Sequence, residues 1–167
     1  SWFAEQGVNY IETSKKPKIS LKALKNKQKQ QEIAGFEAEK FVLKYELRLR
    51  SSHPTFNKIK IISEEDTGAG YDILSYENDT SILLDKHIEV KSYSQKRFDS
   101  KNPYFYWSSN EAKVARKEKG NYYLYIVDRD NMNNVKYKPI IINNPYEEIF
   151  NPNKWIMEPQ SWLFKKL

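Results

Sequence analysis

The 167 residues of this chain suit a single domain with a hydrophobic core, and 28 Lys and Arg against 22 Asp and Glu give a formal net charge of +6. This basic balance fits a polyanionic partner such as nucleic acid, and it fits an ordinary solvated surface equally well. The absence of cysteine excludes disulfides, thiolate nucleophiles and cysteine-bound zinc. No apolar run approaches the ~18–20 residues of a membrane span. We therefore expect a cytoplasmic protein without membrane contact.

The first 31 residues are predicted to be a basic connector or a docked extension, and the domain itself is placed at residues 32–167. Lys and Gln dominate residues 15–31, where Leu21 and Leu24 form only a thin apolar seam. Because such a seam buries little apolar surface, we favour the connector over a short docked helix.

Residues 32–50 are predicted to be an amphipathic helix. Apolar side chains at helical spacing form one stripe: Ala34, Ala38, Phe41, Val42, Tyr45 and Leu49. At ~100° per residue, Glu37 lies at one edge of this stripe and Glu39 and Glu46 at the other. Each of these glutamates either faces a groove beside the packed face or is an ordinary solvent-exposed charge at the edge of that face. Pro54 ends the helix, because the residue before a proline avoids helical backbone angles.

Residues 56–63 are predicted to be a strand, followed by an acidic loop at residues 64–70. The loop does not bind phosphate as a P-loop does, since its glycines lead into a strand and no Gly-Lys-Ser/Thr sequence opens a helix. Two apolar runs at residues 71–77 and 82–92, separated by turn-forming residues, predict a β-hairpin.

Three charged side chains fall together on this hairpin. Glu89 and Lys91 share a strand face, and an antiparallel partner can bring Asp72 beside them. Neighbouring carboxylates repel unless a cation offsets them, and Mg²⁺ is typically held by one or two carboxylates and completed by water and phosphate. Asp72, Glu89 and the backbone carbonyl of Val90 are therefore candidate ligands of Mg²⁺ or Mn²⁺, with Lys91 as charge stabiliser or base. The alternative is a hairpin with ordinary surface salt bridges.

The chain after the hairpin predicts one more helix and two strands. Ser108 and Glu111 have the spacing of a capping box, which indicates a helix to about Lys119. Residues 121–128 are apolar on both faces and predict a central strand, and residues 139–142 predict a short strand. The tail is expected to pack over the core through Trp155 and Trp162. The element order is that of an α/β fold.

Basic and aromatic side chains are concentrated around the second helix. Six of the basic residues form a candidate nucleic-acid-binding face: Lys96, Arg97, Lys101, Lys113, Arg116 and Lys117. The aromatic residues 104–107 either belong to the core, which we favour, or stack on a base.

Other hydrolase chemistries find no support in the sequence. His53 and His87, without any cysteine, do not form a zinc-binding pattern. The Gly-x-Ser-x-Gly turn of a serine hydrolase is absent from the chain.

At these residues the sequence resembles the PD-(D/E)XK nuclease superfamily and, within it, the domain named after the C-terminus of the protein NO VEIN. The resemblance covers about residues 33–150. The matching stretches are Gly35-x-x-Ala38-Glu39-x-x-Val42, Tyr45-Glu46, Gly70-Tyr71-Asp72-Ile73, Ile88-Glu89-Val90-Lys91, Phe105-x-x-Ser108-x-Asn110-Glu111, Tyr122-x-Leu124-Tyr125 and Asn144-Pro145.

The resemblance implies a restriction-endonuclease-like core, in which helices flank a mixed central sheet. It implies that Asp72, Glu89 and Lys91 are the metal-binding acids and the catalytic lysine, and that Glu39 is the helix glutamate that completes the site. Tyr71 stands where the superfamily often has proline. Asn110 and Glu111 are typical of the NO VEIN type, and capping alone would explain Glu111.

Two kinds of function follow from the resemblance. The first is a Mg²⁺-dependent endonuclease acting on DNA, within a bacterial restriction or anti-phage protein that often carries an ATPase or helicase; cutting both strands of a duplex is compatible with a homodimer. The second is a catalytically inactive module that binds nucleic acid, serves as a scaffold or reads modified DNA. The sequence leaves DNA or RNA open as the substrate.

Overall fold

The computed structural model describes residues 20–98, 102–150 and 153–157, apart from the side chains of Arg97 and Phe98. The chain divides into two compact units, Ser1–Glu32 and Ile33–Leu167. The long helix α2, Leu21–Leu49, runs through the boundary. At its start, the Ser20 hydroxyl accepts a hydrogen bond from the backbone N–H of Ala23 at 3.2 Å, as an N-cap residue does.

Within the described residues, one mixed sheet has the strand order β1-β2-β3-β4-β5. The strands are β1 (Lys60–Ile61), β2 (Ile73–Ser75), β3 (Lys86–Tyr93), β4 (Tyr122–Asp128) and β5 (Ile140–Asn143). β3 and β4 are parallel, and the other neighbouring strands are antiparallel. Parallel neighbours need a crossover connection, which here carries α3 (Gln95–Phe98) and α4 (Ser109–Glu118). The α/β class and the central position of β4 are thus confirmed.

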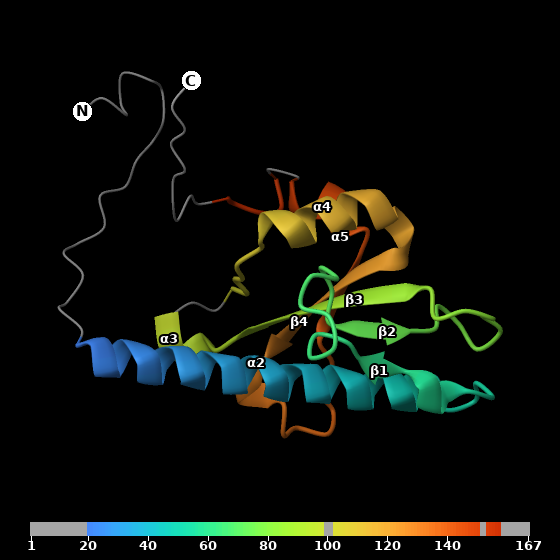
Figure 1. The fold of residues 1–167 in the computed structure, drawn as a ribbon, viewed down its shortest axis with the longest axis horizontal. Coiled ribbons are helices and arrows are strands. Elements are labelled where there is room, and N and C mark those ends of the chain that lie inside the picture. Colours follow the sequence, from blue (N-terminus) through green and yellow to red (C-terminus); the bar gives the residue numbers. More distant parts are fainter. Residues whose placement is uncertain (1–19, 99–101, 151–152, 158–167) are drawn as a thin grey trace, which may run out of the picture. The chain divides into compact units, whose positions relative to one another are not determined.

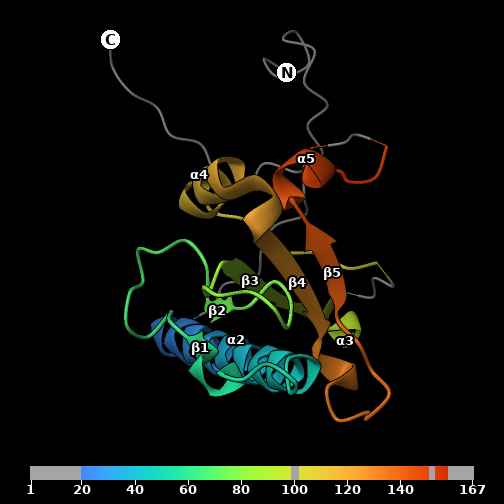
Figure 2. The ribbon, with the colours of Figure 1, turned by 90° about the vertical axis from the view of Figure 1, so that its right-hand side faces the viewer.

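Helices cover both faces of the sheet, with α2 on one side and α4 and α5 (Pro145–Ile149) on the other (Figures 1 and 2). The core against α2 contains Ala38, Val42, Ile73, Ile88, Tyr125 and Val127. The core on the other face contains Tyr93, Leu124, Ile126 and Ile142, with Phe105, Ile149 and Trp155 packed against them. Because side chains alternate along a strand, β3 directs Ile88 towards α2, and Glu89 and Lys91 towards the α4 face.

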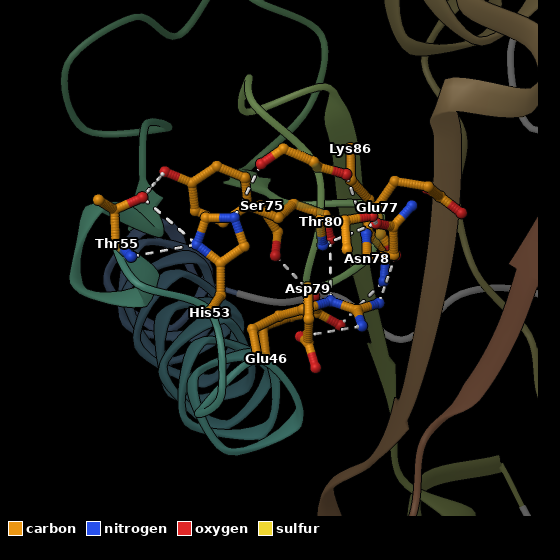
Figure 3. Close-up of polar contacts among 12 residues, drawn as sticks. Glu46, His53, Thr55, Ser75, Glu77, Asn78, Asp79, Thr80 and Lys86 are labelled. Carbon is orange, nitrogen blue, oxygen red and sulfur yellow. Dashed lines mark hydrogen bonds and ion pairs between the residues drawn. The ribbon is translucent and has the colours of Figure 1, made fainter.

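A buried ion pair ties α2 to the sheet (Figure 3). Lys86 of β3 donates to the carboxylate of Glu46 at 3.0 Å, and the Ser75 hydroxyl donates to the same carboxylate at 2.7 Å. The Tyr125 hydroxyl is a third donor to Glu46. The side chains of Glu46 and Lys86 are 0% and 4% exposed, so the predicted placement of Glu46 at the edge of the stripe is wrong. Ala38, Val42 and Glu46 repeat every fourth residue and form the buried row of the helix.

The loop between β2 and β3 is fixed to the end of α2. Arg50 donates to the backbone carbonyls of Tyr76, at 3.0 Å, and Glu77. The His53 ring hydrogen-bonds to the Ser81 carbonyl at 2.8 Å and stacks on Tyr76, with the ring centroids 3.7 Å apart (Figure 3). These contacts hold the chain in a loop over residues 76–85.

Three predicted elements differ in extent from the observed ones. The first helix begins at Leu21 rather than at residue 32, within the stretch predicted to be a connector. The strand predicted at residues 56–63 is confined to Lys60–Ile61, because a turn of 3-10 helix occupies Phe56–Lys58. The hairpin pairing is confirmed, but both its strands are shorter than predicted.

The tail prediction is confirmed in part. Trp155 packs against Phe105, with their ring centroids 5.5 Å apart. Trp162 lies outside the described residues. Tyr104 and Phe105 join the core, as favoured from the sequence, while the Tyr106 side chain is 65% exposed. No helix in the described parts of the chain is both long enough and apolar enough to cross a membrane.

Candidate functional site

The candidate site begins at Asp72, the residue before β2. Its backbone N–H donates to the carbonyl of Ile88 at 2.8 Å, a bond shifted by one residue from the register in which Ile73 faces Ile88. Its side-chain Oδ2 then accepts a hydrogen bond from the backbone N–H of Val90 at 2.8 Å. The side chain of Asp72 thereby replaces the strand partner that Val90 would otherwise have on this side.

The same geometry orients the backbone carbonyl of Val90. The N–H and C=O of one strand residue point to the same side, as the paired bonds of antiparallel ladders require. Since the N–H of Val90 faces Asp72, its carbonyl oxygen also points to the β2 side, away from β4. The structure thus brings the three predicted metal-binding groups of Asp72, Glu89 and Val90 to one end of β2.

Glu89 and Lys91 form an ion pair of 2.7 Å beside Asp72. The ammonium of Lys91 also contacts Glu111 of α4 at 2.7 Å. The side chains are 5%, 16% and 21% exposed for Glu89, Lys91 and Glu111, so these charges interact under weak solvent screening. The lysine is therefore held between two carboxylates from different elements.

The protonation equilibria of the site reflect burial and mutual repulsion. Burial raises the pKa of Asp72 to about 7, although the Val90 N–H acts in the opposite direction. Burial and the charge of Asp72 raise the pKa of Glu89 well above its ordinary value. Burial lowers the pKa of Lys91, but Glu89 and Glu111 raise it by more, so its pKa lies above its ordinary value. The lysine is a cation at neutral pH.

Of the three glutamates left open on the first helix, Glu39 is the one that acts electrostatically on Asp72. Its carboxylate accepts a hydrogen bond from the Ser63 hydroxyl at 2.7 Å, and burial raises its pKa. Glu37 instead forms an exposed salt bridge with Lys40 at 3.0 Å.

A cavity of about 180 Å³ opens between the acidic loop and the start of α4, and Asp72, Glu89 and Glu111 line it. Asn110 fastens α4 to this loop through a 3.2 Å hydrogen bond to the Gly68 carbonyl, and the Tyr122 hydroxyl donates to the Gly70 carbonyl at 2.7 Å. The acidic loop thus forms one wall of the cavity.

A larger groove, of about 540 Å³, lies between α2 and residues 132–137. Its charged lining is Glu37, Lys40, Lys44 and Arg48. With a single carboxylate, this groove offers no comparable set of metal ligands, and the smaller cavity is the candidate site.

The predicted basic face is described in part. Lys96, Lys113, Arg116 and Lys117 are exposed. The guanidinium of Arg116 lies 5.8 Å from the ring centroid of Tyr146. The side chain of Arg97 and all of Lys101 lie outside the described part of the chain.

The donor set fits a hard divalent cation. Asp72 and Glu89 offer two carboxylates whose mutual repulsion a cation would relieve, and Mg²⁺ needs only one or two carboxylates. Among the described residues, no three His, Cys, Asp or Glu side chains are grouped as metal ligands, so any ion here would depend on this pair, the Val90 carbonyl and water.

Sequence reasoning missed the contact of Glu111 with Lys91 and the role of Asn110. The capping box is present: Glu111 N–H donates to the Ser108 hydroxyl and Ser108 N–H to the Glu111 carboxylate. The Ser-x-x-Glu spacing therefore located Glu111 on α4. Its contact with Lys91 depends on the crossover that places α4 over β3, which no local pattern encodes.

A mixed sheet between helices, with two carboxylates and a lysine at the end of its short second strand, defines an α/β domain compatible with a restriction-endonuclease-like core. The family model described as "Protein NO VEIN, C-terminal" matches residues 38–142. This match spans more than half of the chain, which belongs to that family. Comparisons with curated proteins and with solved structures gave no match.

Proposed function

We propose that this chain is a metal-dependent endonuclease domain of the PD-(D/E)XK type, which hydrolyses phosphodiester bonds in DNA. The observation that carries the proposal is the position of Asp72 beside Glu89 and Lys91. The hydrogen bond from the Val90 N–H fixes the first carboxylate, and the 2.7 Å ion pair fixes the other two groups. The family match supports the same assignment without testing the activity.

Asp72, Glu89 and the Val90 carbonyl would hold Mg²⁺ or Mn²⁺. Such an ion would supply charge to polarise the phosphate, to lower the pKa of a water and to offset charge on the leaving oxygen. The protein supplies the partly buried surroundings of these carboxylates, where electrostatic interactions are stronger than in water.

Lys91 acts in this proposal as a positive charge and not as a base, because the two carboxylates beside it raise its pKa. An ammonium has three N–H donors, and Glu89 and Glu111 accept two of them. The third can donate to a phosphate oxygen or to the attacking water. Glu39, whose charge acts on Asp72, would complete the site from α2.

The DNA backbone would lie along the basic face, on Lys96, Arg97, Lys101, Lys113, Arg116 and Lys117. Such contacts position the duplex without reading its sequence. We further propose a cytoplasmic restriction or anti-phage protein as the setting, with an ATPase or helicase module, or a second copy of the chain, as partner.

The test is cleavage of supercoiled plasmid DNA with Mg²⁺ and with EDTA. We expect nicking or linearisation that EDTA stops and that Asp72→Asn and Lys91→Met abolish while DNA binding remains. Lys40→Met is the matched control, because Lys40 pairs with Glu37 at an exposed position. Equal cleavage by Lys91→Met and the control would refute the proposal.

A second candidate is a module that binds nucleic acid or a partner protein without cleavage, or reads modified DNA. It is favoured by the two ion pairs of Lys91, with Glu89 and Glu111, which balance the charge of the lysine without any ligand. Exposed Tyr106 is the residue that would stack on a base. Titration calorimetry with Mn²⁺ separates the candidates. The nuclease must bind Mn²⁺ with a measurable heat that Asp72→Asn abolishes, whereas the second candidate has no such requirement. Equal binding of methylated and plain DNA would exclude a modification reader.

A further inference from the structure

One carboxylate oxygen of Glu111 accepts two hydrogen bonds of different kinds. The Oε2 atom accepts the backbone N–H of Ser108 at 3.1 Å, which belongs to the capping box of α4. The same atom accepts Nζ of Lys91 at 2.7 Å, from β3. A cap alone requires only the first contact, so the second is unexplained by helix capping.

We propose that Glu111 is a positioning residue for Lys91, which fixes the ammonium at the site by coupling it to the start of α4. The inference rests on the proposed function only for its effect on cleavage; the positioning itself is a property of the protein without metal. Lysine has a flexible four-carbon side chain, so an ion pair with one carboxylate does not fix the position of its ammonium.

The support of Glu111 comes from a rigid part of the fold. In the capping box its carboxylate accepts from the Ser108 N–H, and its own backbone N–H donates to the Ser108 hydroxyl. The start of α4 is fastened to the acidic loop by the hydrogen bond from Asn110 to the Gly68 carbonyl. A site residue is held accurately when the group that orients it is itself held by packing and hydrogen bonds. Asn110 and Glu111 thus act as neighbouring parts of one support.

Glu111 also complements Glu89. In the proposed function Glu89 would hold the cation, and sharing its charge with a metal would weaken its interaction with Lys91. Glu111 is not among the proposed metal ligands, so it retains the lysine at that stage. The two carboxylates therefore have separate tasks, one towards the metal and one towards the ammonium.

The experiment separates capping from positioning with three variants. Glu111→Gln keeps a side-chain acceptor at the third helical position, which completes a capping box as glutamate does, but it removes the charge beside Lys91. Ser108→Ala removes the serine half of the cap and leaves the lysine contact. Glu118→Gln removes the same charge from the same helix, where Glu118 contacts His87 and Lys117 rather than Lys91.

The main readout is the acylation rate of Lys91 in the metal-free protein, measured by mass spectrometry. Exposed Lys113, which none of the three substitutions touches, provides the internal reference. We expect Glu111→Gln to raise Lys91 labelling severalfold at an unchanged midpoint of thermal unfolding. Ser108→Ala should lower the midpoint, and Glu118→Gln should leave Lys91 labelling unchanged.

Cleavage is the second readout, with a loss of about ten- to a hundredfold expected for Glu111→Gln, as for other residues that orient a catalytic group. A wild-type protein that does not cleave refutes the proposed function, and labelling still decides the inference. Lys91 labelling that is the same in Glu111→Gln and wild type, or that rises equally in Ser108→Ala, would overturn the inference.

Discussion

The side chain of Asp72 and the backbone of Val90 are joined by a hydrogen bond of 2.8 Å at the point where β2 has not yet begun and β3 continues. An aspartate thus takes the place of a strand backbone. This substitution holds a carboxylate close to the buried Glu89. Burial raises the pKa of both groups, and the charge of Asp72 raises that of Glu89 further.

The first prediction concerns stability against pH without metal. Asp72 loses its proton near its ordinary pKa of 3.8 when unfolded and near 7 when folded. Between these values the folded protein binds the proton more tightly, so the contribution of Asp72 to the free energy of unfolding falls as pH rises from about 4 to about 7, by at most about 1.4 kcal/mol per pH unit. Urea unfolding at several pH values measures this slope.

Asp72→Asn should reduce the fall of unfolding free energy with pH. In the wild-type protein, millimolar Mg²⁺ should restore the free energy of unfolding that is lost above pH 7. Asp79→Asn, a change at an exposed carboxylate of the β2–β3 loop, serves as control and should keep the slope. A wild-type protein whose stability is flat from pH 4 to 7 would contradict the prediction.

The second prediction concerns Gly70, whose φ is +78° and whose missing Cβ would lie 2.7 Å from Cγ2 of Val114. Gly70→Ala should cost about 1–3 kcal/mol, since it combines backbone strain with a clash against α4. Adding Val114→Ala should recover the part due to the clash. Gly120→Ala, where a Cβ meets nothing within 4 Å, is the matched control. Equal unfolding free energies of the two alanine variants would contradict this account.

The third prediction concerns the buried pair of Glu46 and Lys86. Glu46→Ala leaves an unpaired ammonium in the core and should cost about 3–5 kcal/mol of unfolding free energy. The double variant Glu46→Leu/Lys86→Met should recover most of it, because it removes both charges together. Glu37→Ala, at an exposed pair, should change stability by less than about 0.5 kcal/mol. An additive double-mutant cycle would show that the pair is not coupled.

The fourth prediction concerns Arg50, which holds the β2–β3 loop by its backbone carbonyls. Arg50→Ala should speed amide hydrogen exchange over residues 76–85, because local opening then breaks fewer contacts. Arg48→Ala changes an exposed arginine two residues away and should leave that exchange unchanged. Equal exchange in both variants would mean that the loop is held by other contacts.

Local patterns predicted the elements well where one face or one cap decides the structure. The apolar stripe predicted the part of the first helix from residue 32 on, and the capping box located α4. They failed at the turn of Phe56–Lys58, where the Phe56 N–H bonds to the nearby His53 carbonyl, and where distant residues decide. The long loop with exposed Ile82 and Leu83 depends on contacts with His53 and Arg50, which apolar spacing cannot reveal.

The candidate site was predictable only in part for the same reason. The alternation of strand side chains paired Glu89 with Lys91, and hairpin pairing brought Asp72 near them. The choice of Glu39 over Glu37 required the family resemblance, and the burial of Glu46 depends on its distant partner Lys86. The contact of Glu111 with Lys91 depends on tertiary placement of α4.

The crossover between β3 and β4 also has a consequence for the order of assembly. The hairpin of β2 and β3 brings together residues close in the chain, whereas β4 and α4 join only after the connecting segment has closed a long loop. A chain emerging from the ribosome therefore presents Asp72 and Glu89 before it has the strand and helix that complete their surroundings. Synthesis must pass residue 128 before the finished site can exist, which delays the onset of any activity until the domain is almost whole.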